Sequence, residues 1–101
     1  MHSYRLTPQA QEDLKDIRRH TRQEWGEQQT KDYLEGLRST FQMLLKMPNM
    51  GRSRADDLNE GIFSYPYASH MIYYKQAEDD LIIVAVLHER MVPSNHLEER
   101  L

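Results

Sequence analysis

The order of hydrophobic and polar residues divides this chain into a helical first half and a β-rich second half. Between Thr7 and Pro48, hydrophobic residues recur every three or four positions, as in helices that bury one face. From Ile62 onward the period changes to two, which is typical of strands. Residues 2–6 also alternate and predict a short strand, either at a sheet edge or pairing with another strand. The pattern therefore predicts an α+β fold.

The helical half predicts two helices joined by a very short turn. Thr7 suits the N-cap of the first helix, Pro8 suits its first turn, and Gly26 suits its end. The hydrophobic stripe of this helix consists of Ala10, Leu14, Ile17, Thr21 and Trp25. The second stripe, which ends before Pro48, consists of Tyr33, Leu34, Leu37, Phe41, Leu44 and Leu45. Two such helices form an antiparallel hairpin. Gly36, inside the second helix, either permits a close backbone approach or is a tolerated surface glycine.

Three strands are predicted in the second half, at residues 62–65, 69–76 and 81–88. The segment between the last two is short enough for a hairpin, so the strands should form an antiparallel meander. The last strand is hydrophobic at both even and odd positions, which predicts a central strand covered on both faces. The helical hairpin would cover one face of this strand, and we expect the other face to be covered by a partner outside the chain.

Composition limits the size and surroundings of the fold. With 101 residues, the chain is expected to form a single domain, residues 1–101, with one modest core. The mean hydropathy of -0.84 is polar for so small a protein, which agrees with a core completed by a partner. The chain has no cysteine, no hydrophobic leader segment and no hydrophobic run approaching the roughly 18 residues of a membrane span. We therefore expect a cytoplasmic protein.

The charge distribution argues against nucleic acid as the main ligand. The chain has 13 Lys and Arg against 16 Asp and Glu, and residues 48–101 hold five against nine. Proteins that bind nucleic acids usually have an excess of Lys and Arg. These side chains neutralise the phosphates, and the release of counterions supplies much of the binding affinity. The second half of this chain is poorly equipped for such binding.

The stretch VLHERMVPSNHL near the C-terminus is the main candidate for chemistry. His88 and His96 lack the spacing of a known metal motif, and the chain has no nucleophile-elbow glycines, so neither a metal site nor serine catalysis is expected. Strand alternation would place His88 and Arg90 on one side, together with Val84 and Val86. That placement permits ribonuclease chemistry, which needs a base, an acid and cations over the phosphate. The structural alternative is that both residues end a strand in solvent or in a polar network.

Two further groups of side chains each allow two interpretations. The first group is Tyr65, Tyr67, Tyr73 and Tyr74. These tyrosines could stack against nucleic-acid bases, or they could belong to the core and to a protein interface. The second group is Met43, Met47 and Met50. Methionines more often fill gaps in a core than line a binding groove, and both roles stay open here.

An ordered set of segments resembles a known family. The segments are YRLTPQAQEDLKDI, the WG turn, YLEGLRSTF, MPNMGRSR, SHMIYY and VLHERMVPSNHL. Together, over about residues 3–97, they resemble the ParE toxins of the RelE/ParE superfamily of bacterial toxin–antitoxin systems. The more specific parts are the P-x-x-G-R turn that ends at Arg52 and the L-H-x-R sequence that ends at Arg90.

The resemblance implies a small toxin that binds and poisons DNA gyrase, without a cofactor and without turnover of its own. It also implies a hetero-oligomer with a ParD-like antitoxin, which binds DNA and folds its C-terminal segment onto the toxin by helix-in-groove and strand-addition contacts. The toxin residues expected to bind the antitoxin are Leu14, Ile17, Trp25, Tyr33, Leu37 and Phe41. Contacts with the target are expected from the C-terminal segment and from Arg52, Arg54, His88 and Arg90.

Two alternatives remain open within the same superfamily. RelE relatives cut mRNA on the ribosome, and the residues here that would serve such cleavage are Arg52, Arg54, Tyr74, His88 and Arg90. Against cleavage, Phe63 replaces a basic residue common in the family, and a phosphate would be repelled by Asp56, Asp57 and Glu60. The other alternative is an inactive member that serves only as half of an autorepressor complex.

Overall fold

The computed structural model describes residues 3–101, so His2 of the predicted first strand lies outside the described residues. In chain order, the elements are β1 (Tyr4–Leu6), α1 (Pro8–Trp25), α2 (Glu27–Lys46), the 3-10 helix η1 (Pro48–Met50), β2 (Arg52–Ser53), β3 (Phe63–Tyr67), β4 (His70–Ala77), β5 (Asp80–His88) and α3 (Pro93–Leu97). Over this part of the chain, no helix combines the length and hydrophobicity needed to cross a membrane.

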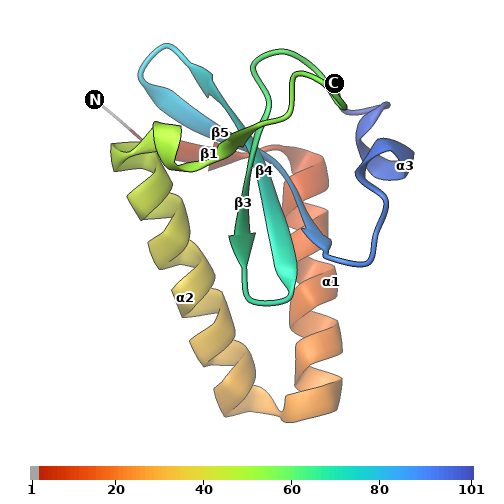
Figure 1. Cartoon of the computed structure of the whole chain (residues 1–101). Coiled ribbons are helices and arrows are strands. Elements are labelled where there is room, and N and C mark those ends of the chain that lie inside the picture. The colour runs from red at the N-terminus through yellow and green to blue at the C-terminus, as the bar shows by residue number, and fades with distance from the viewer. Residues whose placement is uncertain (1–2) are drawn as a thin grey trace.

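Helices α1 and α2 form the predicted antiparallel hairpin, and local capping explains where each begins (Figure 1). The Thr7 hydroxyl accepts a hydrogen bond from the Ala10 amide at 3.1 Å, which satisfies a free N–H group of the first turn. Gly26 has φ +87°, a conformation that side chains disfavour, and the next residue already begins α2. The one-residue turn reverses the chain and sets the two helices side by side.

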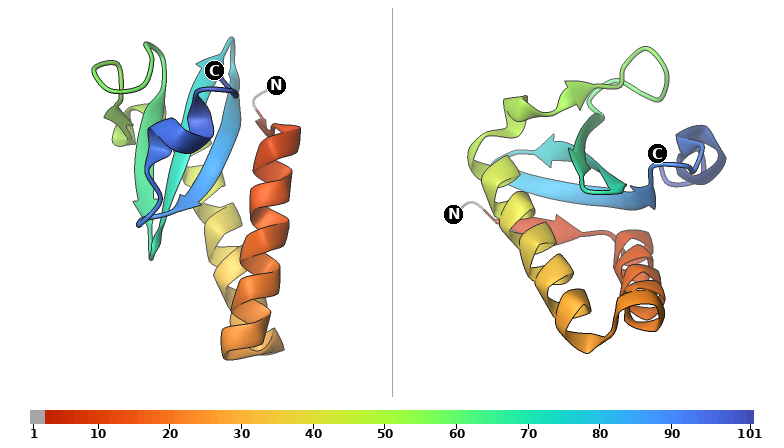
Figure 2. Two further views of the ribbon diagram at one scale, coloured as in Figure 1. Left: turned by 90° about the vertical axis from the view of Figure 1, so that its right-hand side faces the viewer. Right: turned by 60° about the horizontal axis from the view of Figure 1, so that its bottom comes forward.

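The five strands form one sheet in the order β1-β5-β4-β3-β2. Strands β3, β4 and β5 make the predicted antiparallel meander, with ends shifted by no more than two residues from the predicted ones. Strand β1 pairs with β5 in parallel, which is possible because the chain between them is long and contains the helical hairpin and strands β2 to β4. Figure 2 shows the hairpin on one side of the sheet and the loop of residues 54–62 on the other.

Strand β5 contains a bulge that changes which side chains share a face. Ile83 pairs with Tyr74 and Ala85 pairs with Tyr73, so Val84 is an extra residue between them. Val84 consequently packs in the core on the face away from the hairpin, whereas Val86 packs in the core under the hairpin. The prediction that Val84 and Val86 share a face was therefore wrong, because it assumed unbroken alternation.

Two separate cores lie on the two faces of the sheet. The first, under the hairpin, consists of Ala10, Ile17, Leu37, Phe41, Leu44, Ile72, Tyr74, Leu81, Ile83 and Val86. The second consists of Ile62, Tyr73, Val84, Ala85, Leu87 and Leu97. Leu97 comes from α3 and is fully buried. The expectation that the second face is covered from outside the chain was wrong, since α3 and the 54–62 loop cover it.

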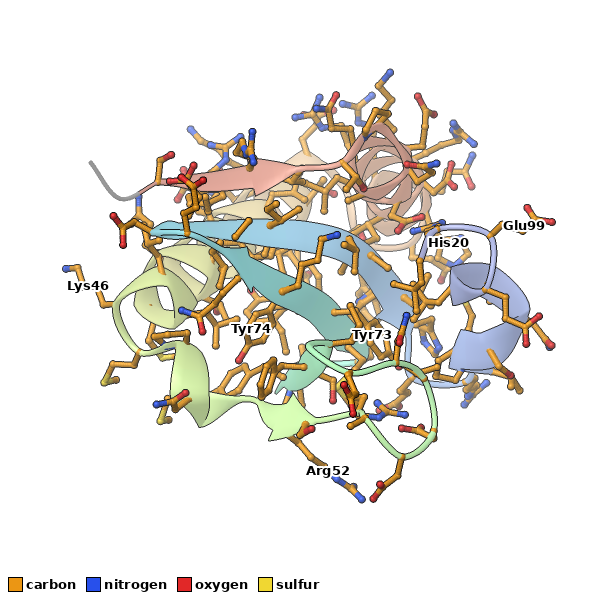
Figure 3. The ribbon with its side chains drawn as sticks, turned by 90° about the horizontal axis from the view of Figure 1, so that it is seen from above. His20, Lys46, Arg52, Tyr73, Tyr74 and Glu99 are labelled. Carbon is orange, nitrogen blue, oxygen red and sulfur yellow. The ribbon has the colours of Figure 1, made fainter. Side chains whose placement is uncertain are left out.

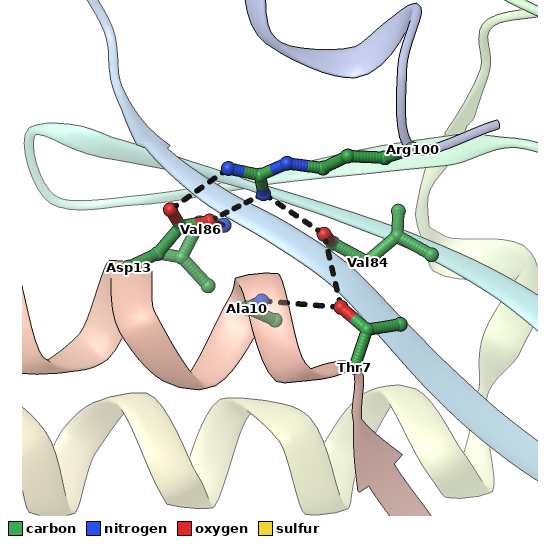
Figure 4. A network of polar contacts seen from close by, with 6 residues as sticks. All are labelled: Thr7, Ala10, Asp13, Val84, Val86 and Arg100. Carbon is green, nitrogen blue, oxygen red and sulfur yellow. Dashed lines mark hydrogen bonds and ion pairs between the residues drawn. The ribbon is translucent and has the colours of Figure 1, made fainter.

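An ion pair fastens the C-terminal segment over the edge of β5 (Figure 4). Strand β1 ends opposite Ile83, so the bulged half of β5 has no strand beside it on that edge. The Asp13 carboxylate accepts a hydrogen bond from the Val86 amide at 3.1 Å, and the Arg100 guanidinium donates to the Val84 carbonyl at 3.1 Å. Arg100 and Asp13 also bind each other through two hydrogen bonds, of 2.7 and 3.1 Å. We call this arrangement the Asp13–Arg100 clasp; it takes the place of a neighbouring strand.

Candidate functional site

The two arginines after η1 have different environments. Arg52 is exposed on the edge strand β2. Arg54 instead binds the Asp57 carboxylate at 2.5 Å, donates to the Ser64 hydroxyl at 3.2 Å and lies 5.4 Å from the centre of the Tyr73 ring. The guanidinium of Arg54 lowers the pKa of the Asp57 carboxyl, and the hydrogen bond from Arg54 to Asp57 raises the pKa of Arg54. Arg54 thus anchors the 54–62 loop to the sheet, whereas Arg52 is exposed and forms no ion pair within residues 3–101.

Tyr74, a residue of the proposed cleavage set, lies in the first core. Its side chain is completely buried, and its hydroxyl donates to the Pro48 carbonyl at 2.7 Å. The Phe63 ring stacks beside it at 5.8 Å between ring centres. Burial raises the pKa of the Tyr74 phenol. The hydroxyl is therefore used to hold the turn before β2 and does not reach the surface.

His88 belongs to a small polar cluster that the sequence did not reveal. It pairs across the sheet with His70, and the two imidazole rings contact edge to face with centres 5.4 Å apart. His70 Nδ1 lies 2.6 Å from the hydroxyl of Tyr33 on α2. Burial, followed by the nearby His88, lowers the pKa of His70 to about 4. His88 Nδ1 accepts a hydrogen bond from the Arg90 amide at 3.1 Å, so the segment after β5 turns at this cluster.

The bulge at Val84 explains why His70 was missed. A hairpin continued regularly from the Ala77–Asp80 pair would place His70 opposite Leu87, whereas the extra residue places it opposite His88. No signal in the sequence marks this register. Arg90 lies beyond the end of β5, so the strand alternation assumed for His88 and Arg90 does not apply.

The residues of the cleavage set do not converge on one place. Arg52 and His88 are on strands three positions apart, which is about 14 Å across the sheet. Arg54 contacts Tyr73 of the second core, while His88 meets the Tyr33–His70 pair under the hairpin. Within residues 3–101, no group of three or more His, Asp or Glu side chains is arranged to hold a metal ion. Among the described residues, Arg52, Arg54 and His88 therefore lie at separate places on the sheet.

A groove lies between α1 and α2. Its cavity has a volume of about 140 Å³ and is lined by Leu14, Lys15, Arg18, Leu34, Leu37, Arg38 and Phe41. The hydrophobic residues form its floor and the cations its rim. Within the described chain, neither Arg18 nor Arg38 forms an ion pair. The groove therefore matches a hydrophobic segment that carries negative charge.

Only part of the predicted antitoxin-binding set lines this groove. Leu14, Leu37 and Phe41 do, although the last two are almost wholly buried. Ile17 packs in the core, and Tyr33 contacts His70. The remaining residue, Trp25, is 64% exposed at the tip of the hairpin. Sequence reasoning missed Leu34 and the cationic rim, although Lys15 and Arg18 directly flank the hydrophobic stripe of α1.

Comparison with known proteins gives one consistent result. A family described as "ParE toxin of type II toxin-antitoxin system, parDE" matches residues 4–93. The chain is 34% identical to "Toxin ParE1" of Caulobacter vibrioides, with 96% of this chain and 99% of the relative covered. It is 32% identical to "Toxin ParE" of Escherichia coli, with 100% and 98% covered.

A solved structure shows the same fold. The structure described as "Chromosomal ParDE TA system from P. aeruginosa" superposes with a TM-score of 0.74, covering 87% of this chain and 96% of that chain. Its sequence identity to this chain is 17%, so this likeness concerns the fold alone.

Proposed function

The chain belongs to the ParE toxins of type II toxin–antitoxin systems. We propose that it acts in the cytoplasm by binding DNA gyrase and is neutralised by a ParD-like antitoxin. In this proposal the toxin carries out no chemical turnover, and any DNA cleavage is performed by gyrase. The observation that carries the proposal is the dispersal of the cleavage set. Tyr74 is buried, Arg54 is paired with Asp57, and His88 lies far from Arg52.

The α1–α2 groove is the proposed antitoxin site. A hydrophobic floor with a cationic rim favours an acidic amphipathic helix, because its apolar face is buried while its carboxylates meet Arg18 and Arg38. The exposed Trp25 indole, at the tip of the hairpin, offers a large hydrophobic contact to a segment that extends beyond the groove. Ile17 and Tyr33 would support the surface from beneath.

The same four residues are proposed to serve target binding, two by direct contact and two by positioning. Arg52 and Arg90 are exposed and would touch the target directly. Arg54 and His88 would position the segments that carry them, through the bond to Asp57 and the bond from the Arg90 amide. Loss of Arg54 or His88 should therefore weaken target binding by disordering a segment.

The test is a comparison of gyrase inhibition with mRNA cleavage. Purified toxin should inhibit gyrase supercoiling, and a ParD-like antitoxin should restore it. Expression should induce a DNA-damage response and filamentation. If the protein leaves gyrase unaffected while cutting mRNA in a translation reaction, and His88→Ala abolishes that cutting, the endonuclease alternative is correct. Absence of any growth defect would identify an inactive member.

A further inference from the structure

The turn that joins α2 to β2 presents two exposed methionines within four residues. Met47 is 49% exposed and Met50 is 51% exposed. Single exposed hydrophobic residues are common and need no explanation. Two on one short turn are more informative, provided that the turn cannot fold them inward.

The turn is fixed at both ends and in the middle. At its start, the Met47 amide donates to the Met43 carbonyl at 2.9 Å, at the end of α2. In the middle, the buried Tyr74 hydroxyl donates to the Pro48 carbonyl. At its end, Arg52 pairs with Ser64 of β3. These contacts fix the backbone of the turn, on which both methionine side chains are about half exposed.

Gly51 fits this turn because the backbone touches Tyr74. A Cβ atom at this position would collide with the Tyr74 hydroxyl and ring, which are buried and cannot move aside. The P-x-x-G part of the sequence motif is thus accounted for by one tyrosine, which binds the carbonyl of Pro48 and packs against Gly51. The buried residue Tyr74 therefore holds the backbone of this exposed turn in one conformation.

Cations border the exposed methionines. Lys46 precedes them and Arg52 follows them, and the side chains of both point outward while Tyr74 lies inside (Figure 3). Across residues 3–101, neither cation takes part in an ion pair. Methionine side chains are unbranched and polarisable, so they adapt to hydrophobic pockets at protein interfaces. The surface thus has a hydrophobic centre and a positive border.

We propose that the Met47–Arg52 turn, together with Lys46, is the docking surface for the toxin's protein target, which supplies a hydrophobic pocket bordered by carboxylates. The inference rests on the proposed function, in which the toxin acts by binding a protein. Nucleic acid fits this surface less well, because methionines contribute nothing to phosphate binding and the second half of the chain is acidic. The surface is separate from the α1–α2 groove, so the target and the antitoxin contact different parts of the toxin.

The test compares variants that keep or remove the hydrophobic side chains. Met47→Ser with Met50→Ser should weaken binding to purified gyrase at least tenfold and relieve growth arrest on expression. Met47→Leu with Met50→Leu keeps the hydrophobic surface, so this variant should still bind gyrase and still arrest growth. Arg52→Glu should weaken gyrase binding, whereas the matched reversal Lys31→Glu, on the exposed side of α2, should not. Unchanged antitoxin binding by every variant shows that the fold is intact.

The outcomes separate this surface from the proposed target. If the double variant Met47→Ser with Met50→Ser (the serine pair) arrests growth and binds gyrase like the wild type, the proposed docking surface is wrong. If the wild type does not bind gyrase but the serine pair still relieves growth arrest, the surface stands and gyrase is not its target. If the wild type causes no arrest, the surface has no target and the proposal fails. Binding to nucleic acid that falls with Arg52→Glu but not with the serine pair would also overturn it.

Discussion

The two faces of the sheet are covered in very different ways. One face lies under two helices of 18 and 20 residues, whose side chains form the larger core. The other face is covered by a helix of five residues and by the 54–62 loop, with Leu97 and Ile62 as their main buried contacts. The first face therefore holds the fold together, while the second depends on a few contacts and can open locally.

The largest effect is expected from emptying the core under the hairpin. Phe41 is 1% exposed and contacts the Tyr4 ring at 5.4 Å between ring centres. Phe41→Ala should lower the free energy of unfolding by about 4 kcal/mol, because it removes hydrophobic burial and leaves a cavity. Urea denaturation measures the loss, with Gln42→Ala on the exposed side of α2 as the control. A loss of less than about 1 kcal/mol would contradict the assigned role of this face.

A smaller and more local effect is expected on the second face. Leu97→Ala should cost about 2 to 3 kcal/mol, because the side chain is fully buried but sits on a segment that can detach. Hydrogen exchange should rise in residues 93–101 while α1 and α2 stay protected. If both faces lose protection together, the second face is not a separate unit.

The Asp13–Arg100 clasp should contribute less than either core. The two side chains are 12% and 16% exposed, so Arg100→Ala leaves a mostly buried carboxylate without its cation and should cost about 2 kcal/mol. A double-mutant cycle with Asp13→Ala should show that the two losses are not additive. The exposed Arg22–Glu27 pair is the control, and Arg22→Ala should cost less than about 1 kcal/mol. Additive losses for Asp13 and Arg100 would mean that they do not act together.

The last effect is expected at the histidine cluster under the hairpin, where it is absent at neutral pH and appears only as the pH falls. The pKa of His70 is about 4 in the folded protein, below its ordinary value of 6.5. Above pH 6.5, His70 is neutral in both states; between pH 6.5 and 4 the unfolded chain binds the proton first, so stability falls as pH falls. The other titratable groups that act on the pKa of His70 are His88, Glu89 and His20. His70→Asn should flatten this part of the profile, measured by urea denaturation at each pH, whereas His96→Asn should leave it unchanged.

The candidate site was predictable in part. The hydrophobic stripe of α1 and α2 located the groove, because helical periodicity states which residues share a face. The roles of single residues were not predictable in the same way. Arg54, Tyr74 and His88 have side chains typical of a phosphate site. In the structure, however, Arg54 binds Asp57 and Ser64, the Tyr74 hydroxyl binds the Pro48 carbonyl, and His88 contacts His70.

Local signals in the sequence specify the two helices, the meander and the turn between the helices, because capping, periodicity and the positive φ of Gly26 act within a few residues. Which distant residues come into contact depends on the packed fold. One extra residue in β5 brings His70 to His88, Tyr74 pins the exposed methionine turn, and Asp13 binds Arg100 across a separation of 87 residues. Such contacts depend on register and chain closure, which arise when all the elements pack together.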